Sequence, residues 1–166
     1  MSDNQSHYLH EVVITAIIID GERYLITRRP ETKKRFPGMW TVPGGRLEPA
    51  DYLAFSKDTE AYWYNVLERV VVREVQEEVG LDIKNVRYLT SLATVHDDGN
   101  PSIVISCIAD FVGGEVQLQP EEADRFAWVT TEESKNYPLI DGIYEEFVMI
   151  DRIRAGEKNI LWEKHS

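Results

Sequence analysis

The chain has 166 residues, of which 43% are apolar and 28% are charged. This length and composition fit one domain with a sizeable core, and no apolar run is long enough to span a membrane. The formal net charge of −11 excludes a general affinity for DNA or RNA in the absence of a local basic patch. We therefore expect no nucleic-acid partner and no membrane partner.

Residues 1–7 are polar and lack the pattern of a secretion signal, so we expect a flexible N-terminal arm of residues 1–7 before one domain at residues 8–166. Cys107 is the single cysteine, which excludes an internal disulfide and favours a cytoplasmic location. Because Cys107 lies in an alternating apolar segment, it is expected to be a buried filler.

The first elements along the chain are predicted to be strands. The β-branched run at residues 12–19 is typical of a strand covered on both faces. Asp20-Gly21 signals a hairpin turn. The next elements are expected in the order strand 22–29, loop 30–38, strand 39–42 and the turn Pro43-Gly44-Gly45.

A long helix is predicted at residues 59–79, with Asp58 or Thr59 as its N-cap. Its apolar residues recur every four positions and form a core stripe of Leu67, Val71, Val75 and Val79. Gly80 is expected to end the helix, as a C′ glycine commonly does.

The second half of the chain predicts further strands and one more helix. Paired strands are expected at 86–96 and 102–111, short strands at 115–118 and 126–129, and a helix at 142–153 capped by Asp141. The order strands, helix, strands, helix predicts an α/β sandwich with a mixed β-sheet.

Three carboxylates lie within five positions of the predicted long helix. Glu74 shares a helix face with Glu77 and Glu78, and exposed like charges at this spacing repel by a few tenths of a kcal/mol. The helix C-terminus also disfavours negative charge. A hard divalent cation such as Mg²⁺ or Mn²⁺ would reverse this repulsion. A solvated acidic helix end is the alternative interpretation.

Residues 73–81 and Gly45 together resemble the Nudix box, Gly-x5-Glu-x7-Arg-Glu-U-x-Glu-Glu-x-Gly-U, where U is a bulky aliphatic residue. Counting forward from Gly45, Asp51 stands where the pattern has its first glutamate; counting back from Arg73, Asn65 does. Gly45 and Arg73 are 73 − 45 = 28 positions apart where the pattern has 14, so 14 extra residues lie inside the box. The resemblance implies a Nudix-type α/β/α sandwich.

The resemblance also implies Mg²⁺-dependent hydrolysis of a pyrophosphate bond in a nucleoside diphosphate linked to another group. Glu74, Glu77, Glu78 and the carbonyl of Gly45 would be metal ligands, and Glu74 could instead deprotonate the attacking water. Arg73 would orient a carboxylate. Many members of the family add an acid from outside the box, for which Glu121 and Glu122 are the candidates here.

Substrate-binding candidates surround these acids in the sequence. Arg28 and Arg29 could contact phosphates, Phe36 could stack on a base, and Asn136 could bind a base edge. Gly44 and Gly45 allow the backbone to approach a ligand closely. Each has a structural alternative, as a loop, core or turn residue.

The 14 extra residues, 51–64, contain five aromatic side chains. They could form a pocket wall or a homodimer contact, or they could pack on the domain and extend its core, which is the preferred interpretation.

We expect a small nucleotide substrate, either a nucleoside triphosphate or a nucleotide sugar. The alternative is a non-catalytic Nudix-fold module that binds a nucleotide. An isoprenoid diphosphate isomerase is disfavoured, because Cys107 is core-like and the histidines are scattered.

Overall fold

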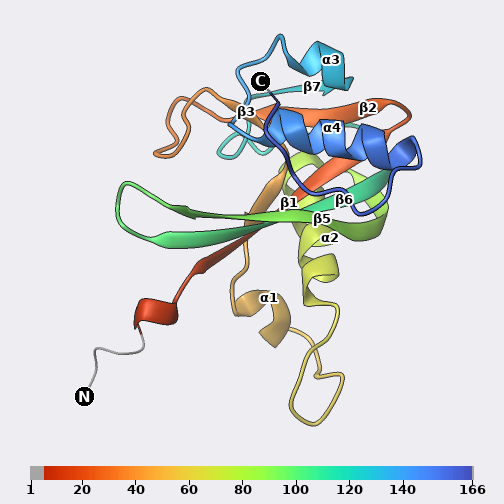
Figure 1. The fold of residues 1–166 in the computed structure, drawn as a ribbon. Helices are drawn as coiled ribbons and strands as arrows, with labels where there is room; N and C mark the ends of the chain where they lie inside the picture. The colour runs from red at the N-terminus through yellow and green to blue at the C-terminus, as the bar shows by residue number, and fades with distance from the viewer. Residues whose placement is uncertain (1–5, 166) are drawn as a thin grey trace.

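The computed structural model describes residues 6–165 of the chain (Figure 1). Within this range the chain forms a 3-10 turn, seven strands and four α-helices. Their order is η1 (Ser6–Tyr8), β1 (Glu11–Asp20), β2 (Arg23–Arg28), β3 (Trp40–Thr41), β4 (Gly44–Arg46), α1 (Ala50–Leu53), α2 (Val66–Val79), β5 (Asp82–Val95), β6 (Pro101–Gly113), β7 (Arg125–Val129), α3 (Thr131–Ser134) and α4 (Ile143–Arg154).

Strand β1 organises the sheet. It runs parallel to β6, with Glu11 opposite Ser102 and Ile19 opposite Asp110. It is antiparallel to β4 near its start and to β2 near its end. The neighbours β3 and β7 pair with β2, and β5 pairs antiparallel with β6. The predicted mixed sheet is therefore confirmed.

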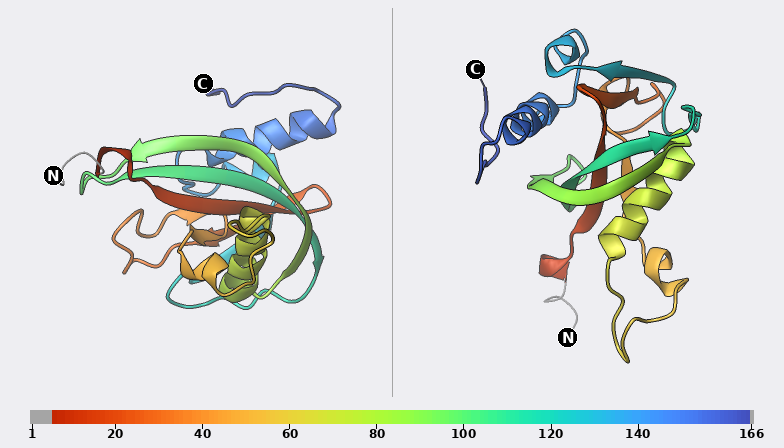
Figure 2. Two further views of the ribbon diagram at one scale, coloured as in Figure 1. Left: turned by 90° about the horizontal axis from the view of Figure 1, so that it is seen from below. Right: turned by 90° about the vertical axis from the view of Figure 1, so that its right-hand side faces the viewer.

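The two longer helices cover opposite faces of this sheet (Figures 1 and 2). Alternate side chains of β1 point to opposite faces. Accordingly, Ile14 and Ile18 join the core under α2, whereas Ile17 joins the core under α4. The predicted strand covered on both faces is confirmed, and Cys107 is a buried member of the α2 core as expected.

The predicted helix at 59–79 is too long. Helix α2 begins at Val66, after Asn65 in the left-handed conformation with φ 52°. Asp58 does not cap it, because its carboxylate accepts a hydrogen bond from the Tyr64 backbone and pairs with Arg69. At the other end Gly80 ends the helix with φ 71°, as predicted.

The segment between α1 and α2 projects from the body of the molecule (Figure 1). Phe55, Tyr62 and Tyr64 are each about half or more exposed. Tyr52 and Trp63 pack on each other, with ring centroids 5.4 Å apart. The expectation that these rings extend the domain core is wrong, because most of them pack within the segment or face solvent.

Other local predictions are corrected by tertiary pairing. Gly44 and Gly45 lie in strand β4 rather than in a turn, because they pair with β1. Residues 115–118 form no strand; instead the Gln117 amide donates to the Val79 carbonyl at the end of α2. Asp141 does not cap α4, whose N-cap is Gly142 with φ 93°. Helix α3 was not predicted, although its Thr130–Glu133 capping box is a recognised sequence signal.

The predicted N-terminal arm falls largely outside the described residues, since 1–5 are not described and Ser6–Tyr8 form the 3-10 turn. The single domain at 8–166 stays a prediction. Of the helices described in this structure, none is both long and apolar enough to cross a membrane.

Candidate active site

A cavity of about 950 Å³ opens over the sheet and is bounded by both longer helices. Helix α2 contributes Glu74 and Glu78, and α4 contributes Glu146. Strand β4 supplies Gly44 and Gly45. Because this cavity brings together predicted site residues from three elements, it is the candidate active site.

Glu78 is a buried acid in the cavity wall, with 6% of its surface exposed. Its Oε2 accepts a hydrogen bond of 2.9 Å from the Gly44 amide. The pKa of Glu78 is raised to about 7, mainly by burial and also by the negative charges of Glu122 and Glu74, while the Gly44 amide and Arg29 oppose the shift. The positive charge of Arg29 therefore compensates this carboxylate only in part.

Glu74 lies against the backbone of Gly45. A Cβ atom added to Gly45 would lie 2.4 Å from the Glu74 Oε2, which is closer than a real contact allows. Burial raises the pKa of Glu74, while the guanidinium of Arg73 opposes the shift. Because residue 45 has no side chain, the Glu74 carboxylate can pack directly against its backbone.

Arg73 joins three acids at the rim of the cavity. Its guanidinium contacts the carboxylates of Glu74 at 2.8 Å and Glu77 at 2.7 Å. It also pairs with Asp51, whose side chain is 8% exposed. Asp51 therefore holds the Arg73 side chain. Asn65, the other residue that could align with the first glutamate of the box, is exposed.

Glu77 stands apart from the other two acids of the motif. Its side chain is 56% exposed and lies outside the cavity lining. Among residues 6–165, no three His, Cys, Asp or Glu side chains are grouped closely enough to hold a metal ion. Arg73 forms ion pairs with Glu74 and Glu77, whereas Glu78 forms none among the described residues and is influenced only by the more distant charge of Arg29.

The two acids predicted outside the motif are placed differently. Glu122 lines the cavity and forms a 2.7 Å ion pair with Lys33. Glu121 is exposed and does not line it. Glu122 is therefore the one of the pair that the fold brings to Glu78.

The two candidate arginines also diverge. Arg29 lines the cavity, and burial lowers its pKa against the opposing effect of Glu122 and Glu78. Arg28 lies outside the lining and pairs with Asp124 and Glu31. A half-buried guanidinium near two acids can bind a phosphate, so Arg29 fits that role better than Arg28.

Of the remaining predicted contacts, Phe36, Gly44 and Gly45 line the cavity. Asn136 is exposed in the turn after α3 and does not. Cys107 is also absent from the lining, consistent with its place in the core.

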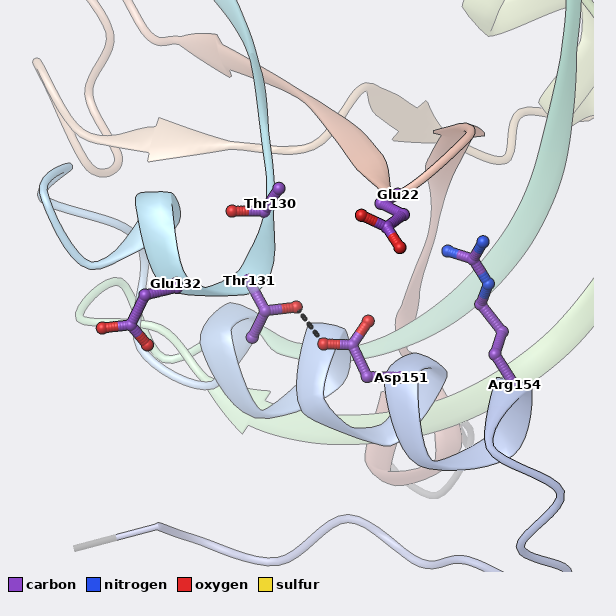
Figure 3. A pocket seen from close by; sticks show the side chains of 6 residues that line it. All are labelled: Glu22, Thr130, Thr131, Glu132, Asp151 and Arg154. Atoms are coloured by element: carbon purple, nitrogen blue, oxygen red, sulfur yellow. Dashed lines mark hydrogen bonds between the residues drawn. The ribbon is translucent and has the colours of Figure 1, made fainter.

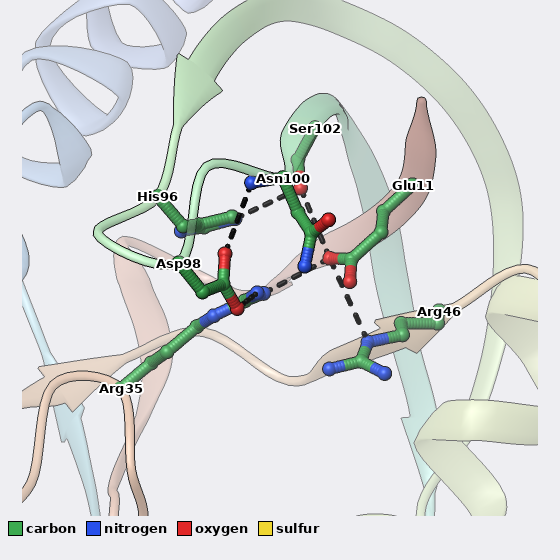
Figure 4. A network of polar contacts seen from close by, with 7 residues as sticks. All are labelled: Glu11, Arg35, Arg46, His96, Asp98, Asn100 and Ser102. Carbon is green, nitrogen blue, oxygen red and sulfur yellow. Dashed lines mark hydrogen bonds and ion pairs between the residues drawn. The ribbon is translucent and has the colours of Figure 1, made fainter. Parts of the chain in front are cut away.

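Several cavity residues were not among the predicted site residues. Arg35 contacts Glu11 at 2.9 Å and Asp98 at 3.1 Å, which fastens the loop after β2 to β1 and to the β5–β6 hairpin (Figure 4). Glu146 and Trp162 also line the cavity. The one sequence signal for Glu146 is an acid at a core-facing position of an amphipathic helix.

A second, open cleft of about 600 Å³ lies near the end of α4 (Figure 3). Its Asp151 accepts hydrogen bonds from Thr131 and Tyr24. None of the predicted site residues lies in this cleft.

Comparison with known proteins gives the family of the chain. The model of the NUDIX domain matches residues 9–148. The NAD-capped RNA hydrolase NudC of Stutzerimonas stutzeri is 31% identical over 116 residues, which cover 68% of this chain and 33% of that protein. The NAD-capped RNA hydrolase NUDT12 of Macaca fascicularis is 30% identical over 74% of this chain and 22% of its own length. The chain thus spans less than half the length of these relatives.

Solved structures agree in fold. A MutT NUDIX hydrolase from Burkholderia pseudomallei superposes with a TM-score of 0.68 at 20% identity, covering 86% of this chain and 98% of that one. The NUDIX domain of Shewanella oneidensis NrtR, in complex with ADP ribose, superposes with a TM-score of 0.64 at 17% identity. The match covers 93% of this chain and 92% of that one. Nudix hydrolases generally use divalent metals. With its α/β/α fold and its matched domain, this chain belongs to the Nudix hydrolase family.

Proposed function

We propose that this protein hydrolyses a pyrophosphate bond in a nucleotide with the help of a divalent cation. The observation that carries this proposal is the buried carboxylate of Glu78, which lies beside Glu74 and Glu122 in a cavity that also holds Arg29. The Gly44 amide and the charge of Arg29 offset the cost of burying this negative charge only in part, and a bound cation would lower the cost further.

The donors that face the cavity suit Mg²⁺ or Mn²⁺. The carboxylates of Glu74 and Glu78 and the carbonyl of Gly45 supply oxygen, which hard cations prefer. Glu122 is a further oxygen donor, and Glu77 would have to leave Arg73 to join them. When bound, the cation would neutralise the charge that develops on the phosphoryl oxygens.

The chain's own residues would carry the rest of the chemistry. A water oxygen forms a bond to phosphorus while the phosphorus–oxygen bond of the anhydride breaks. The proton released by water goes to a carboxylate; Glu74 is our candidate, as the alternative to its role as a metal ligand, because Arg73 holds it at the cavity rim. Arg29 would bind a phosphate, and Phe36 would contact the nucleoside.

The test is product release from a panel of nucleotides with Mg²⁺ and then Mn²⁺. The panel contains nucleoside triphosphates, nucleotide sugars, ADP-ribose and NAD. It also includes NAD-capped RNA, because two relatives are named for that substrate. This member of the panel tests the prediction that the protein has no nucleic-acid partner. If the protein hydrolyses no member of the panel, the proposal is contradicted.

A second candidate is a non-catalytic module that binds a nucleotide. The observation that favours it is the engagement of Arg73 with Asp51, Glu74 and Glu77 at once, which leaves the acids of the motif partly occupied. Nucleotide binding without turnover in the same panel would support it. A cytoplasmic location and a homodimer remain predictions for separate measurement.

A further inference from the structure

Glu146 is a buried acid on the cavity wall that the proposed hydrolysis does not use. It lies on α4, the helix that covers the sheet face opposite to α2, and only 4% of its surface is exposed. Ser106 donates a hydrogen bond of 3.0 Å to its Oε1, and Thr15 donates to Ser106 at 3.3 Å. Both hydroxyl residues also line the cavity.

The other carboxyl oxygen of Glu146, Oε2, has no hydrogen-bond partner among the described residues. No fully buried side-chain oxygen or nitrogen among these residues lacks a partner, so Oε2 keeps some accessible surface. Because Glu146 lines the cavity, this surface is available to a ligand there. Burial raises the pKa of Glu146 to about 7, and Ser106 alone opposes this shift, so no cation compensates the acid. The position is costly for folding and open to a ligand's donor.

Trp162 lies at the same cavity, beyond the residues that the NUDIX domain model matches. The segment after α4 turns back and runs beside that helix (Figures 1 and 2). The Trp162 indole N–H donates to the Gly142 carbonyl at 3.1 Å, which fixes the ring, while 40% of the residue stays exposed. A fixed, partly open indole offers a stacking surface.

We propose that Glu146 and Trp162 form the subsite for the nucleobase of the substrate. The base stacks on the Trp162 ring and donates an N–H to the Glu146 Oε2. The subsite favours bases that carry an amino group on the edge facing Glu146. This inference rests on the proposed function for the identity of the ligand as a nucleotide.

The test is equilibrium binding by calorimetry, using nucleoside triphosphates whose α,β- and β,γ-bridging oxygens are both replaced by methylene groups. These ligands cannot be cleaved there, so binding is measured apart from turnover. Guanosine is compared with inosine, and adenosine with purine riboside, because each pair differs by one amino group. The parent should bind the amino-bearing member of at least one pair more than 10-fold tighter.

In Glu146→Gln, this discrimination should fall below about 3-fold. The glutamine oxygen keeps the Ser106 bond, which turns its NH₂ group toward the base, where a donor cannot bind an N–H. The matched control is Glu145→Gln, a buried neighbour that accepts from the His165 amide and lies outside the cavity lining. That control should keep the parent's discrimination.

Trp162→Ala should weaken the binding of all the nucleotide analogues by about 10-fold or more, with or without the amino group, because stacking tolerates any base. Leu161→Ala, on the same segment and 78% exposed, is its control. Tripolyphosphate, which has no base, should bind the parent and both subsite variants equally.

Unchanged discrimination in Glu146→Gln, or a parent that does not distinguish the pairs, would overturn the subsite. Discrimination that depends on Glu146 in a protein that cleaves no nucleotide would overturn the proposed hydrolysis and leave the subsite standing.

Discussion

The carboxylate of Asp51 forms an ion pair with the guanidinium of Arg73, which lies 22 positions later in the chain. The segment between them leaves the body of the molecule and returns, so the two ends of the interrupted motif meet as a direct ion pair. Because Arg73 also holds Glu74 and Glu77, this pair fixes the acids that we expect to act on the substrate.

The first prediction concerns that pair. Asp51→Asn should lower kcat/KM by about 10- to 100-fold, because groups that orient metal ligands contribute on that scale. Asp51→Glu, which restores the charge, should recover part of the loss. The control is Asp58→Asn, which removes the Arg69 ion pair of the projecting segment. Equal activity of Asp51→Asn and the parent would show that Arg73 needs no anchor.

The second prediction concerns Glu78. Glu78→Gln should reduce turnover by more than about 100-fold, more than the loss of a supporting group, while circular dichroism stays unchanged. Calorimetry should detect uptake of Mg²⁺ by the parent and none by the variant. Glu77→Gln is a useful comparison, since that side chain is 56% exposed and is not part of the cavity lining. A fully active Glu78→Gln protein would contradict the proposed chemistry.

The third prediction separates the two glycines of β4. A Cβ at Gly44 would lie 2.3 Å from the backbone oxygen of Ile14, which cannot move away without breaking the β1–β4 pairing. Gly44→Ala should therefore lower the free energy of unfolding by about 1–3 kcal/mol. Urea denaturation measures this loss.

At Gly45 the obstacle is the flexible end of Glu74. Gly45→Ala should therefore lose activity with a smaller loss of stability. The control is Gly113→Ala, where a Cβ would meet nothing within 4 Å. The reverse pattern, with Gly45→Ala unfolded and Gly44→Ala unaffected, would argue against this account.

The fourth prediction is a pH dependence of stability from Glu146. Its folded-state pKa is raised from 4.5 to about 7, so the folded protein binds this proton more tightly than the unfolded chain. The resulting stabilisation is complete below pH 4.5 and is lost as the pH rises through 7. Glu146→Gln has no such loss. Its free energy of unfolding relative to the parent should therefore rise as the pH increases from 4.5 through 7, by about 3 kcal/mol at most.

Urea denaturation of both proteins at pH 5 and pH 7.5 checks this prediction. The difference in the free energy of unfolding between variant and parent should be small at pH 5 and larger at pH 7.5. A difference that is constant with pH would mean that Glu146 titrates normally.

The fifth prediction concerns the projecting segment. Replacing Phe55, Tyr62 and Tyr64 together by serine should leave turnover within about twofold of the parent, because none of them lines the cavity. Sedimentation of the same variant tests the dimer-contact interpretation, which requires that a dimeric parent dissociate. A large loss of turnover in a variant that keeps the parent's oligomeric state would restore the pocket-wall interpretation.

The sequence by itself determined the elements whose patterns are local. The β-branched run of β1, the Asp20-Gly21 hairpin and the apolar stripe of α2 each carry their own signal, because side-chain periodicity and turn chemistry act over a few residues. The spacing of Glu74, Glu77 and Glu78 also predicts the metal chemistry that we propose for the site.

Only the tertiary structure decided which side chains share the cavity. Arg29 and Glu122 line it whereas their neighbours Arg28 and Glu121 do not, and residues 54–65 stay outside helix α2. Glu146 and Trp162 reach the same cavity from a helix and a tail that come far later in the chain. The physical reason is that burial and charge compensation depend on contacts between distant segments, which sequence spacing does not encode.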